Sequence, residues 1–89
     1  MYQAHLIISG LVQGVFYRAT CKETAIRLGL GGWVRNLSSG DVEVLAQGEK
    51  ENIEKLIEWC RKGPLHAKVS NLKIEWQNKT ENFTTFKVI

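Results

Sequence analysis

A glycine-containing loop with an arginine lies between the first apolar segment of the chain and its first amphipathic segment. It reads Gly10-Leu11-Val12-Gln13-Gly14-Val15-Phe16-Tyr17-Arg18. Gly14 can adopt a positive φ, which lets successive backbone N–H groups point into one concavity at the start of a helix. Arg18 can add a planar set of donors for bidentate contact with phosphate oxygens. The loop indicates a phosphate-sized anion site, although a plain turn followed by a solvated arginine fits the loop alone equally well.

A second segment supports the anion site. It reads Gly32-Trp33-Val34-Arg35-Asn36-Leu37-Ser38-Ser39-Gly40-Asp41-Val42, and Gly48 follows after five more residues. Together the two segments resemble the signatures of the acylphosphatase family, Gly-x-Val-Gln-Gly-Val-x-(Phe or Met)-Arg and Gly-(aromatic)-Val-x-Asn-x-x-x-Gly-x-Val-x5-Gly. The chain matches every position of the second signature and all but one of the first, where Tyr17 replaces Phe or Met.

This resemblance implies a hydrolase that converts small-molecule acyl phosphates to carboxylate and inorganic phosphate, without a metal or a cofactor. It assigns the phosphate cradle to the backbone N–H groups of Gln13, Gly14, Val15, Phe16 and Tyr17. It makes Arg18 the phosphate-binding cation and Asn36 the residue that positions the attacking water. Tyr17 keeps a ring for packing and adds a hydroxyl that needs water or another partner.

The chemistry of an acyl phosphate fits these roles. Its carboxylate leaving group is a weak base that needs no general acid. Catalysis can then rest on orientation and on stabilising the charge of the phosphoryl oxygens, which Arg18 and aligned amides can do. The Asn36 side chain can accept a hydrogen bond from water and donate another, but an amide is too weak a base to take the proton. The substrate phosphate or bulk water is therefore expected to receive it.

The elements that must position these residues follow from the hydrophobic pattern. Apolar residues recurring every three or four positions predict helices over residues 17–28 and 49–62, and Gly63-Pro64 ends the second helix. Alternating or β-branched segments predict strands over residues 4–12, 33–37, 41–46, 69–77 and 83–89. A polar turn over residues 78–82 precedes the last strand.

The element order βαββαβ with an additional C-terminal strand predicts an α+β fold, a ferredoxin-like sandwich with two helices on one face of an antiparallel-rich sheet. At 89 residues the chain is expected to form a single domain over residues 1–89. In this topology we expect the two helices to run roughly parallel. Cys21, early in one helix, and Cys60, late in the other, would then be separate core thiols too far apart for a disulfide.

Composition restricts the partners. The net charge is +3, and the twelve Lys and Arg residues are scattered rather than gathered in a stripe, so nucleic acid is not expected as a partner. Two Cys and two His show none of the paired spacings of a zinc site. The chain has no apolar run of bilayer length and no signal peptide at its start, which predicts a cytoplasmic location and no membrane contact. A monomer is expected.

Two alternatives belong to other functional classes. A non-catalytic phosphate-sensing module of the same fold would keep the cradle and Arg18 but would not require Asn36. An RRM-like RNA-binding domain shares the fold but carries an aromatic run on a central strand. Residues 41–46 have two acids and no aromatic side chain, which disfavours RNA binding.

Overall fold

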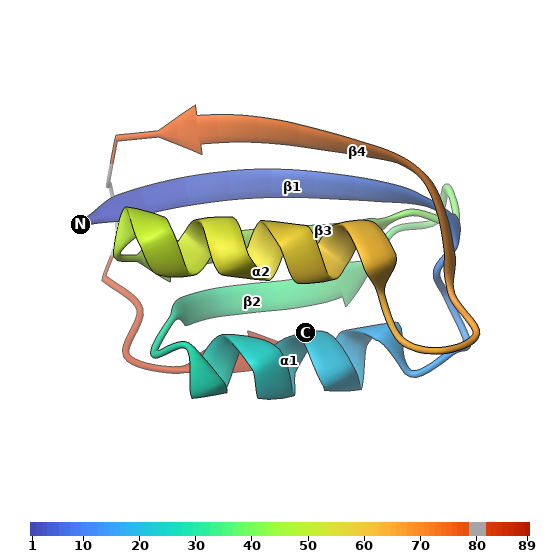
Figure 1. Ribbon diagram of the computed structural model, residues 1–89, viewed down its shortest axis with the longest axis horizontal. Helices are drawn as coiled ribbons and strands as arrows, with labels where there is room; N and C mark the ends of the chain where they lie inside the picture. The colour runs from blue at the N-terminus through green and yellow to red at the C-terminus, as the bar shows by residue number, and fades with distance from the viewer. Residues whose placement is uncertain (79–81) are drawn as a thin grey trace.

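A five-stranded sheet forms one layer of the protein and two helices form the other (Figure 1). The computed structural model describes residues 1–78 and 82–89. The strands are β1 (Tyr2–Leu11), β2 (Gly31–Asn36), β3 (Val42–Gly48), β4 (Lys68–Gln77) and β5 (Phe86–Val88). The helices are α1 (Tyr17–Arg27) and α2 (Lys50–Lys62). The predicted ferredoxin-like α+β fold, with its additional C-terminal strand, is confirmed.

The sheet has the strand order β4-β1-β3-β2-β5. β1 pairs antiparallel with β3 and β4, and β2 pairs antiparallel with β3 and parallel with β5. β1 and β2 therefore run in the same direction, so α1, which joins them, runs back against both. By the same argument α2, between β3 and β4, runs opposite to α1. The helices are antiparallel (Figure 1), and the prediction of parallel helices is wrong.

The antiparallel helices also correct the prediction for the two cysteines. Cys21 is near the start of α1 and Cys60 is near the end of α2, so both lie at the same end of the helix layer. Their side chains are close enough to share a hydrogen bond. Both are buried and neither is in a disulfide. A hydrogen bond with the Cys60 side chain, together with burial, raises the pKa of the Cys21 thiol. They are core thiols, as expected, but they are neighbours.

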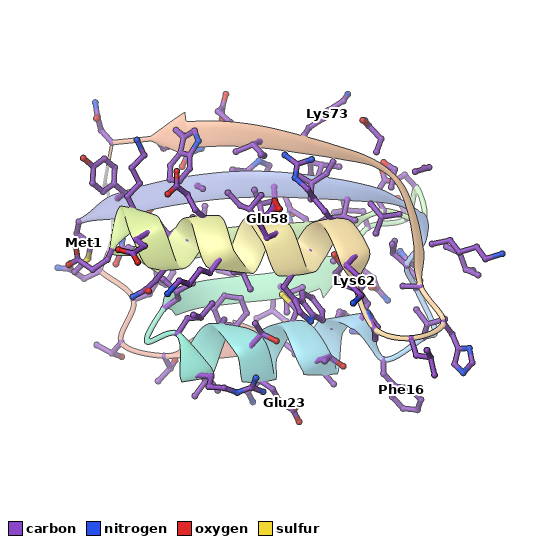
Figure 2. All side chains as sticks on the ribbon, viewed as in Figure 1. Met1, Phe16, Glu23, Glu58, Lys62 and Lys73 are labelled. Atoms are coloured by element: carbon purple, nitrogen blue, oxygen red, sulfur yellow. The ribbon has the colours of Figure 1, made fainter. Side chains whose placement is uncertain are left out.

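The core lies between the sheet and the helices. Strand alternation turns every second side chain toward the helices, and each helix contributes one apolar stripe. The buried residues include Ala4, Leu6, Ile8, Val34, Val42, Val44, Ala46 and Phe86 from the sheet and Cys21, Ala25, Ile53, Leu56, Ile57 and Cys60 from the helices. The outer faces of the helices carry polar residues such as Glu23, Glu58 and Lys62 (Figure 2). Neither helix is long and apolar enough to cross a membrane in the described part of the chain.

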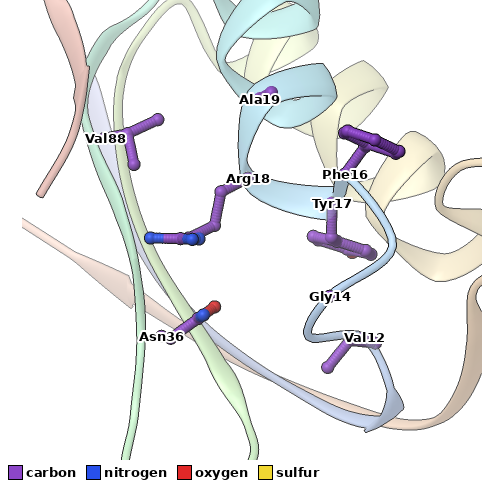
Figure 3. A pocket seen from close by; sticks show the side chains of 8 residues that line it. All are labelled: Val12, Gly14, Phe16, Tyr17, Arg18, Ala19, Asn36 and Val88. Atoms are coloured by element: carbon purple, nitrogen blue, oxygen red, sulfur yellow. The ribbon is translucent and has the colours of Figure 1, made fainter.

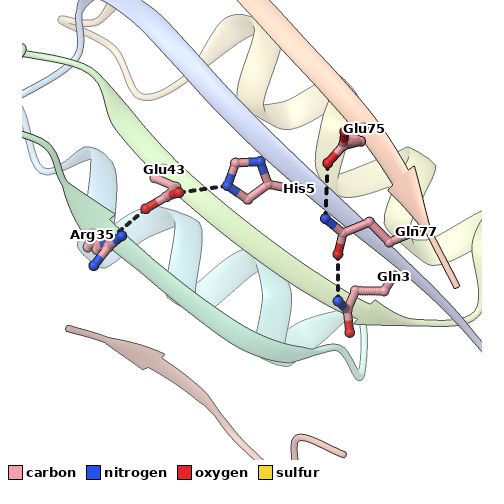
Figure 4. A network of polar contacts seen from close by, with 6 residues as sticks. All are labelled: Gln3, His5, Arg35, Glu43, Glu75 and Gln77. Carbon is pink, nitrogen blue, oxygen red and sulfur yellow. Dashed lines mark hydrogen bonds and ion pairs between the residues drawn. The ribbon is translucent and has the colours of Figure 1, made fainter. Parts of the chain in front are cut away.

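The opposite face of the sheet carries a chain of polar contacts (Figure 4). The Glu43 carboxylate on β3 lies between the side chains of His5 on β1 and Arg35 on β2. Its Oε2 is 2.6 Å from His5 Nε2, and its Oε1 accepts a hydrogen bond from Arg35 Nε. This carboxylate joins three neighbouring strands on the face without helices.

The bounds of all five predicted strands differ from the observed ones by up to three residues, and two of the differences have a visible cause. β2 begins at Gly31 rather than at residue 33. Gly32 has a φ of 134°, and a Cβ there would lie 1.8 Å from the Leu45 carbonyl oxygen, so the close pairing with β3 requires glycine. β5 is shorter than predicted: it begins at Phe86, and in the segment before it the Phe83 N–H donates to the side-chain oxygen of Gln47. Of the predicted turn over residues 78–82, residues 79–81 lie outside the described part of the chain.

Candidate active site

A cavity of about 330 Å³ opens where the loop after β1 meets the start of α1 and the end of β2 (Figure 3). Its lining residues are Val12, Gly14, Phe16, Tyr17, Arg18, Ala19, Asn36 and Val88. Five of the seven site residues predicted from the sequence are among them. The other two, Gln13 and Val15, belong to the same loop but do not line the cavity.

Two residues of the loop adopt a left-handed backbone conformation before the helix begins. Gly14 has a φ of 75° and Phe16 a φ of 64°. A Cβ at Gly14 would meet nothing within 4 Å, so glycine is needed there for its conformation and not for space. The backbone hydrogen bond from Thr20 N to Phe16 O, at 3.1 Å, closes the first turn of α1. The amides of Tyr17, Arg18 and Ala19 precede it and have no acceptor in the helix, which leaves them available to an anion.

Arg18 is exposed, and its side chain extends into the cavity toward Asn36 (Figure 3). Within residues 1–78 and 82–89, no hydrogen bond or ion pair engages its guanidinium. None of the described residues that line the cavity is acidic. The donors of Arg18 are therefore free for an anionic ligand, and no acidic side chain among the described lining residues competes for them.

Asn36 is the last residue of β2 and shares the helix-facing side of the strand with Val34. Its side-chain oxygen Oδ1 is buried and accepts no hydrogen bond from the described residues. An unpaired buried acceptor costs about 1–3 kcal/mol. A water molecule or ligand that donates to this oxygen removes that cost.

Gln13 contributes through its side chain in a way that the sequence did not indicate. Its Nε2 donates to the backbone oxygens of Leu37 at 2.8 Å and Asp41 at 2.9 Å. These two residues flank the turn that follows Asn36 directly. Gln13 therefore ties the cradle loop to the β2–β3 hairpin, and its partners, 24 and 28 positions away, could not be found from a local pattern.

Tyr17 is buried and packs against Trp59, with ring centroids 5.1 Å apart. Its hydroxyl donates to the backbone oxygen of Cys60 at 2.6 Å. In a helix that oxygen would accept from residue 64, but Pro64 has no N–H. Burial, together with the neighbouring Cys60, raises the pKa of Tyr17, so the hydroxyl remains a neutral donor. The hydroxyl therefore has as its partner the backbone carbonyl of Cys60 near the end of α2.

The remaining lining residues are Val12, Ala19 and Val88, and the sequence did not point to them. Val12 and Ala19 flank the predicted site residues, and their positions next to Gln13 and Arg18 were the available signal. Val88 comes from β5, whose parallel pairing with β2 brings the C-terminal segment to the cavity. Tertiary pairing alone places it there.

These features define a class of protein: a ferredoxin-like α+β domain with an amide cradle, an unpaired arginine and an unpartnered amide oxygen where strands β1 and β2 end. A family model described as Acylphosphatase matches residues 4–88. The chain belongs to the acylphosphatase family.

Similar proteins cover nearly the whole chain. An acylphosphatase of Pelotomaculum thermopropionicum is 45% identical over 86 residues, which are 97% of this chain and 94% of that protein. The crystal structure of acylphosphatase from Bacillus subtilis matches with a TM-score of 0.97 at 30% identity, covering 100% of this chain and 99% of the other. An acylphosphatase structure from Coxiella burnetii matches with a TM-score of 0.93 at 44% identity, covering 99% and 92%.

Proposed function

We propose that this protein hydrolyses the carboxyl–phosphate bond of small acyl phosphates to a carboxylate and inorganic phosphate. One observation carries the proposal: the amides at the start of α1, the unpaired guanidinium of Arg18 and the unpartnered Oδ1 of Asn36 meet at one cavity. The first two can hold a phosphoryl group, and the third can hold a water beside it.

The phosphoryl group is bound by the cradle amides of residues 13–17, by the free amides of Arg18 and Ala19 in the first turn of α1, and by the Arg18 side chain. Charge on the three equatorial oxygens persists in a loose transition state, and fixed donors aimed at these oxygens stabilise it. Arg18 can contact two oxygens through its planar guanidinium, and the helix dipole adds to the amides. The carboxylate then leaves without a proton, because it is a weak base.

Asn36 orients the attacking water. Its Oδ1 accepts a hydrogen bond from the water, which directs an oxygen lone pair toward the phosphorus atom. An amide cannot take the proton that the water loses. This proton passes to the substrate phosphate or, late in the step, to bulk water.

The test compares Arg18→Ala and Asn36→Ala in hydrolysis of an acyl phosphate, with inorganic phosphate as a competitive inhibitor and EDTA present. Arg18→Ala should lose turnover by at least about a hundredfold and also lose phosphate inhibition, because a charge-stabilising donor is removed. Asn36→Ala should lose turnover by about a hundredfold while phosphate inhibition is largely kept. EDTA should leave the wild-type rate unchanged.

Matched controls are Arg27→Ala, an exposed arginine at the other end of α1, and Asn71→Ala, an exposed asparagine on β4. Both should keep wild-type rates. A fully active Asn36→Ala protein would sink the water-positioning role. A wild-type protein that binds phosphate but releases no carboxylate would instead establish the non-catalytic phosphate-sensing module.

A further inference from the structure

Phe16 combines two features that are unusual for a large apolar residue. The residue is 82% exposed, although it lines the cavity. Its φ of 64° is left-handed, and within residues 1–78 and 82–89 no other non-glycine residue has a positive φ. The ring extends from the rim of the cavity into solvent (Figures 2 and 3).

The backbone of the cradle does not account for a phenylalanine at this position. Glycine adopts the left-handed conformation without steric cost, and asparagine adopts it readily. Gly14, two residues earlier, has a left-handed φ of this kind. The ring of Phe16 stabilises no core, because it is exposed. A strained residue of this kind at a ligand site points to a function of its side chain.

The direction of the reaction suggests that function. In phosphoryl transfer the attacking and the leaving oxygens lie roughly in line, on opposite sides of the phosphorus atom. If Asn36 holds the attacking water, the acyl group leaves on the side of the phosphoryl group that faces away from Asn36. Phe16 lies across the cavity from Asn36 (Figure 3). The acyl group is therefore directed to the rim that carries Phe16.

The cavity has room for more than a phosphoryl group. Its volume of about 330 Å³ is within the range of small-molecule sites, roughly 300–1,000 Å³. Beside the polar groups, its lining includes the apolar side chains of Val12, Ala19 and Val88. Val88 lies on the far side of the cavity from Phe16 (Figure 3), so an apolar acyl group that reaches the Phe16 rim meets chiefly the exposed aromatic ring.

We propose that the Phe16 ring contacts the acyl group of the substrate and makes the protein prefer aromatic and other bulky apolar acyl phosphates over small ones. This inference rests on the proposed function and names its substrate class. The contact buries aromatic surface that solvent otherwise covers, and aromatic pairs add a further attraction through their edges and faces. The Phe16 side chain then determines specificity, whereas phosphate is bound by Arg18 and by the cradle amides, that of Phe16 included, without the ring.

The experiment measures kcat/KM for benzoyl phosphate and for acetyl phosphate in the wild type, Phe16→Gly, Phe16→Asn and Phe16→Tyr. Gly and Asn keep the left-handed backbone without the ring, and Tyr keeps the ring. In Phe16→Gly and Phe16→Asn, the ratio of kcat/KM for benzoyl phosphate to kcat/KM for acetyl phosphate should fall about threefold to tenfold. Acetyl phosphate turnover and inhibition by inorganic phosphate are measured in the same variants, because a change in the cradle backbone at Phe16 would alter both substrates equally and leave the ratio unchanged. Phe16→Tyr should keep the wild-type ratio.

Ile26→Ala is the matched control, because Ile26 is another exposed apolar residue, on α1 two turns beyond Arg18. It should leave the ratio unchanged. An unchanged ratio in both ring-less variants overturns the inference, as does an equal loss for both substrates, which would assign Phe16 to the backbone shape of the cradle. A wild type that hydrolyses neither compound overturns the proposed function as well, so the two failures are distinguishable.

Discussion

At the scale of single residues, Tyr17 connects the candidate site to the core. Its backbone belongs to the proposed phosphate cradle, whereas its hydroxyl completes the end of α2 by donating to the Cys60 carbonyl. The family signature has Phe or Met at this position, and neither can donate that hydrogen bond. The hydroxyl should therefore contribute to stability and not to catalysis.

Tyr17→Phe should lower the free energy of unfolding by about 1–3 kcal/mol, because it leaves the buried Cys60 carbonyl without a donor. The rate of acyl phosphate hydrolysis should stay within about twofold, since the ring and the cradle backbone remain. Urea unfolding followed by circular dichroism measures the first effect. Tyr2→Phe is the control, because the Tyr2 ring is half-exposed and no hydrogen bond engages its hydroxyl within the described residues. Equal unfolding midpoints in wild type and Tyr17→Phe would contradict this account.

At the scale of elements, the site depends on two segments that the Gln13 side chain connects. The cradle belongs to the β1–α1 loop, and Asn36 ends β2 in the following hairpin. The two hydrogen bonds from Gln13 to Leu37 and Asp41 hold the hairpin turn against the loop. In the proposed mechanism, the distance between the phosphate and the attacking water therefore depends on this side chain.

Gln13→Met keeps the length of the side chain and removes both hydrogen bonds. We expect kcat to fall by about tenfold, because small misplacements of a reacting group cost up to about a hundredfold. Inhibition by inorganic phosphate should change much less, since the cradle amides are backbone groups. Gln77→Met, at the opposite end of the sheet, should leave kcat unchanged. If phosphate inhibition and kcat fell in parallel in Gln13→Met, Gln13 would shape the cradle and not the hairpin.

The polar chain on the open face of the sheet gives a pH dependence to stability. Partial burial opposes ionisation of Glu43, but the hydrogen bonds and charges of His5 and Arg35 prevail and lower its pKa from the ordinary value of 4.5. A carboxylate with a lowered pKa in the folded state stabilises the protein fully above the unfolded pKa. That stabilisation is lost as the pH falls through the folded pKa.

The free energy of unfolding of the wild type should therefore decrease below about pH 4.5, and more steeply than that of Glu43→Gln. At pH 7 the variant should be less stable, and the difference should shrink toward pH 3. Urea titrations across this range provide the measurement. A constant difference between the two proteins at all pH values would mean that the ionisation of Glu43 contributes nothing.

At the scale of the whole molecule, binding at the cavity should stabilise the fold. The residues that line the cavity come from the β1–α1 loop, α1, β2 and β5, which meet only in the folded protein. The unfolded chain therefore has no comparable site. A ligand that binds only the folded state adds free energy by mass action.

Inorganic phosphate at ten times its Kd should add about 1.4 kcal/mol to the free energy of unfolding. For a domain of this size that corresponds to a rise in Tm of roughly 6–11 °C. The rise should be absent in Arg18→Ala, and it should persist in Asn36→Ala. Thermal unfolding with phosphate, against chloride at equal ionic strength, measures it. An equal rise in wild type and Arg18→Ala would mean that phosphate binds elsewhere or acts as a general salt.

Much of the fold could be predicted because it follows from short-range patterns. The apolar stripes Tyr17-Cys21-Ala25-Leu28 and Ile53-Leu56-Ile57-Cys60 are buried as their spacing predicts, except that Leu28, just beyond α1, is only partly buried. The bounds of β2 and β5 were less accurate, since Gly31 and Gly32 look like a break in the sequence. In the fold they allow a close approach to β3 and to residue 83.

The sequence by itself determined the kinds of elements and the glycine loop before α1. Through its resemblance to a family it also indicated that Arg18 and Asn36 belong to one site. These features depend on residue types and on spacings within one turn of helix or one strand. Only the tertiary structure decided that the helices run antiparallel, that Cys21 meets Cys60, that Gln13 holds the hairpin and that Val88 lines the cavity. Each of these contacts joins segments far apart in the chain, and strand order and direction, which no local period encodes, bring them together.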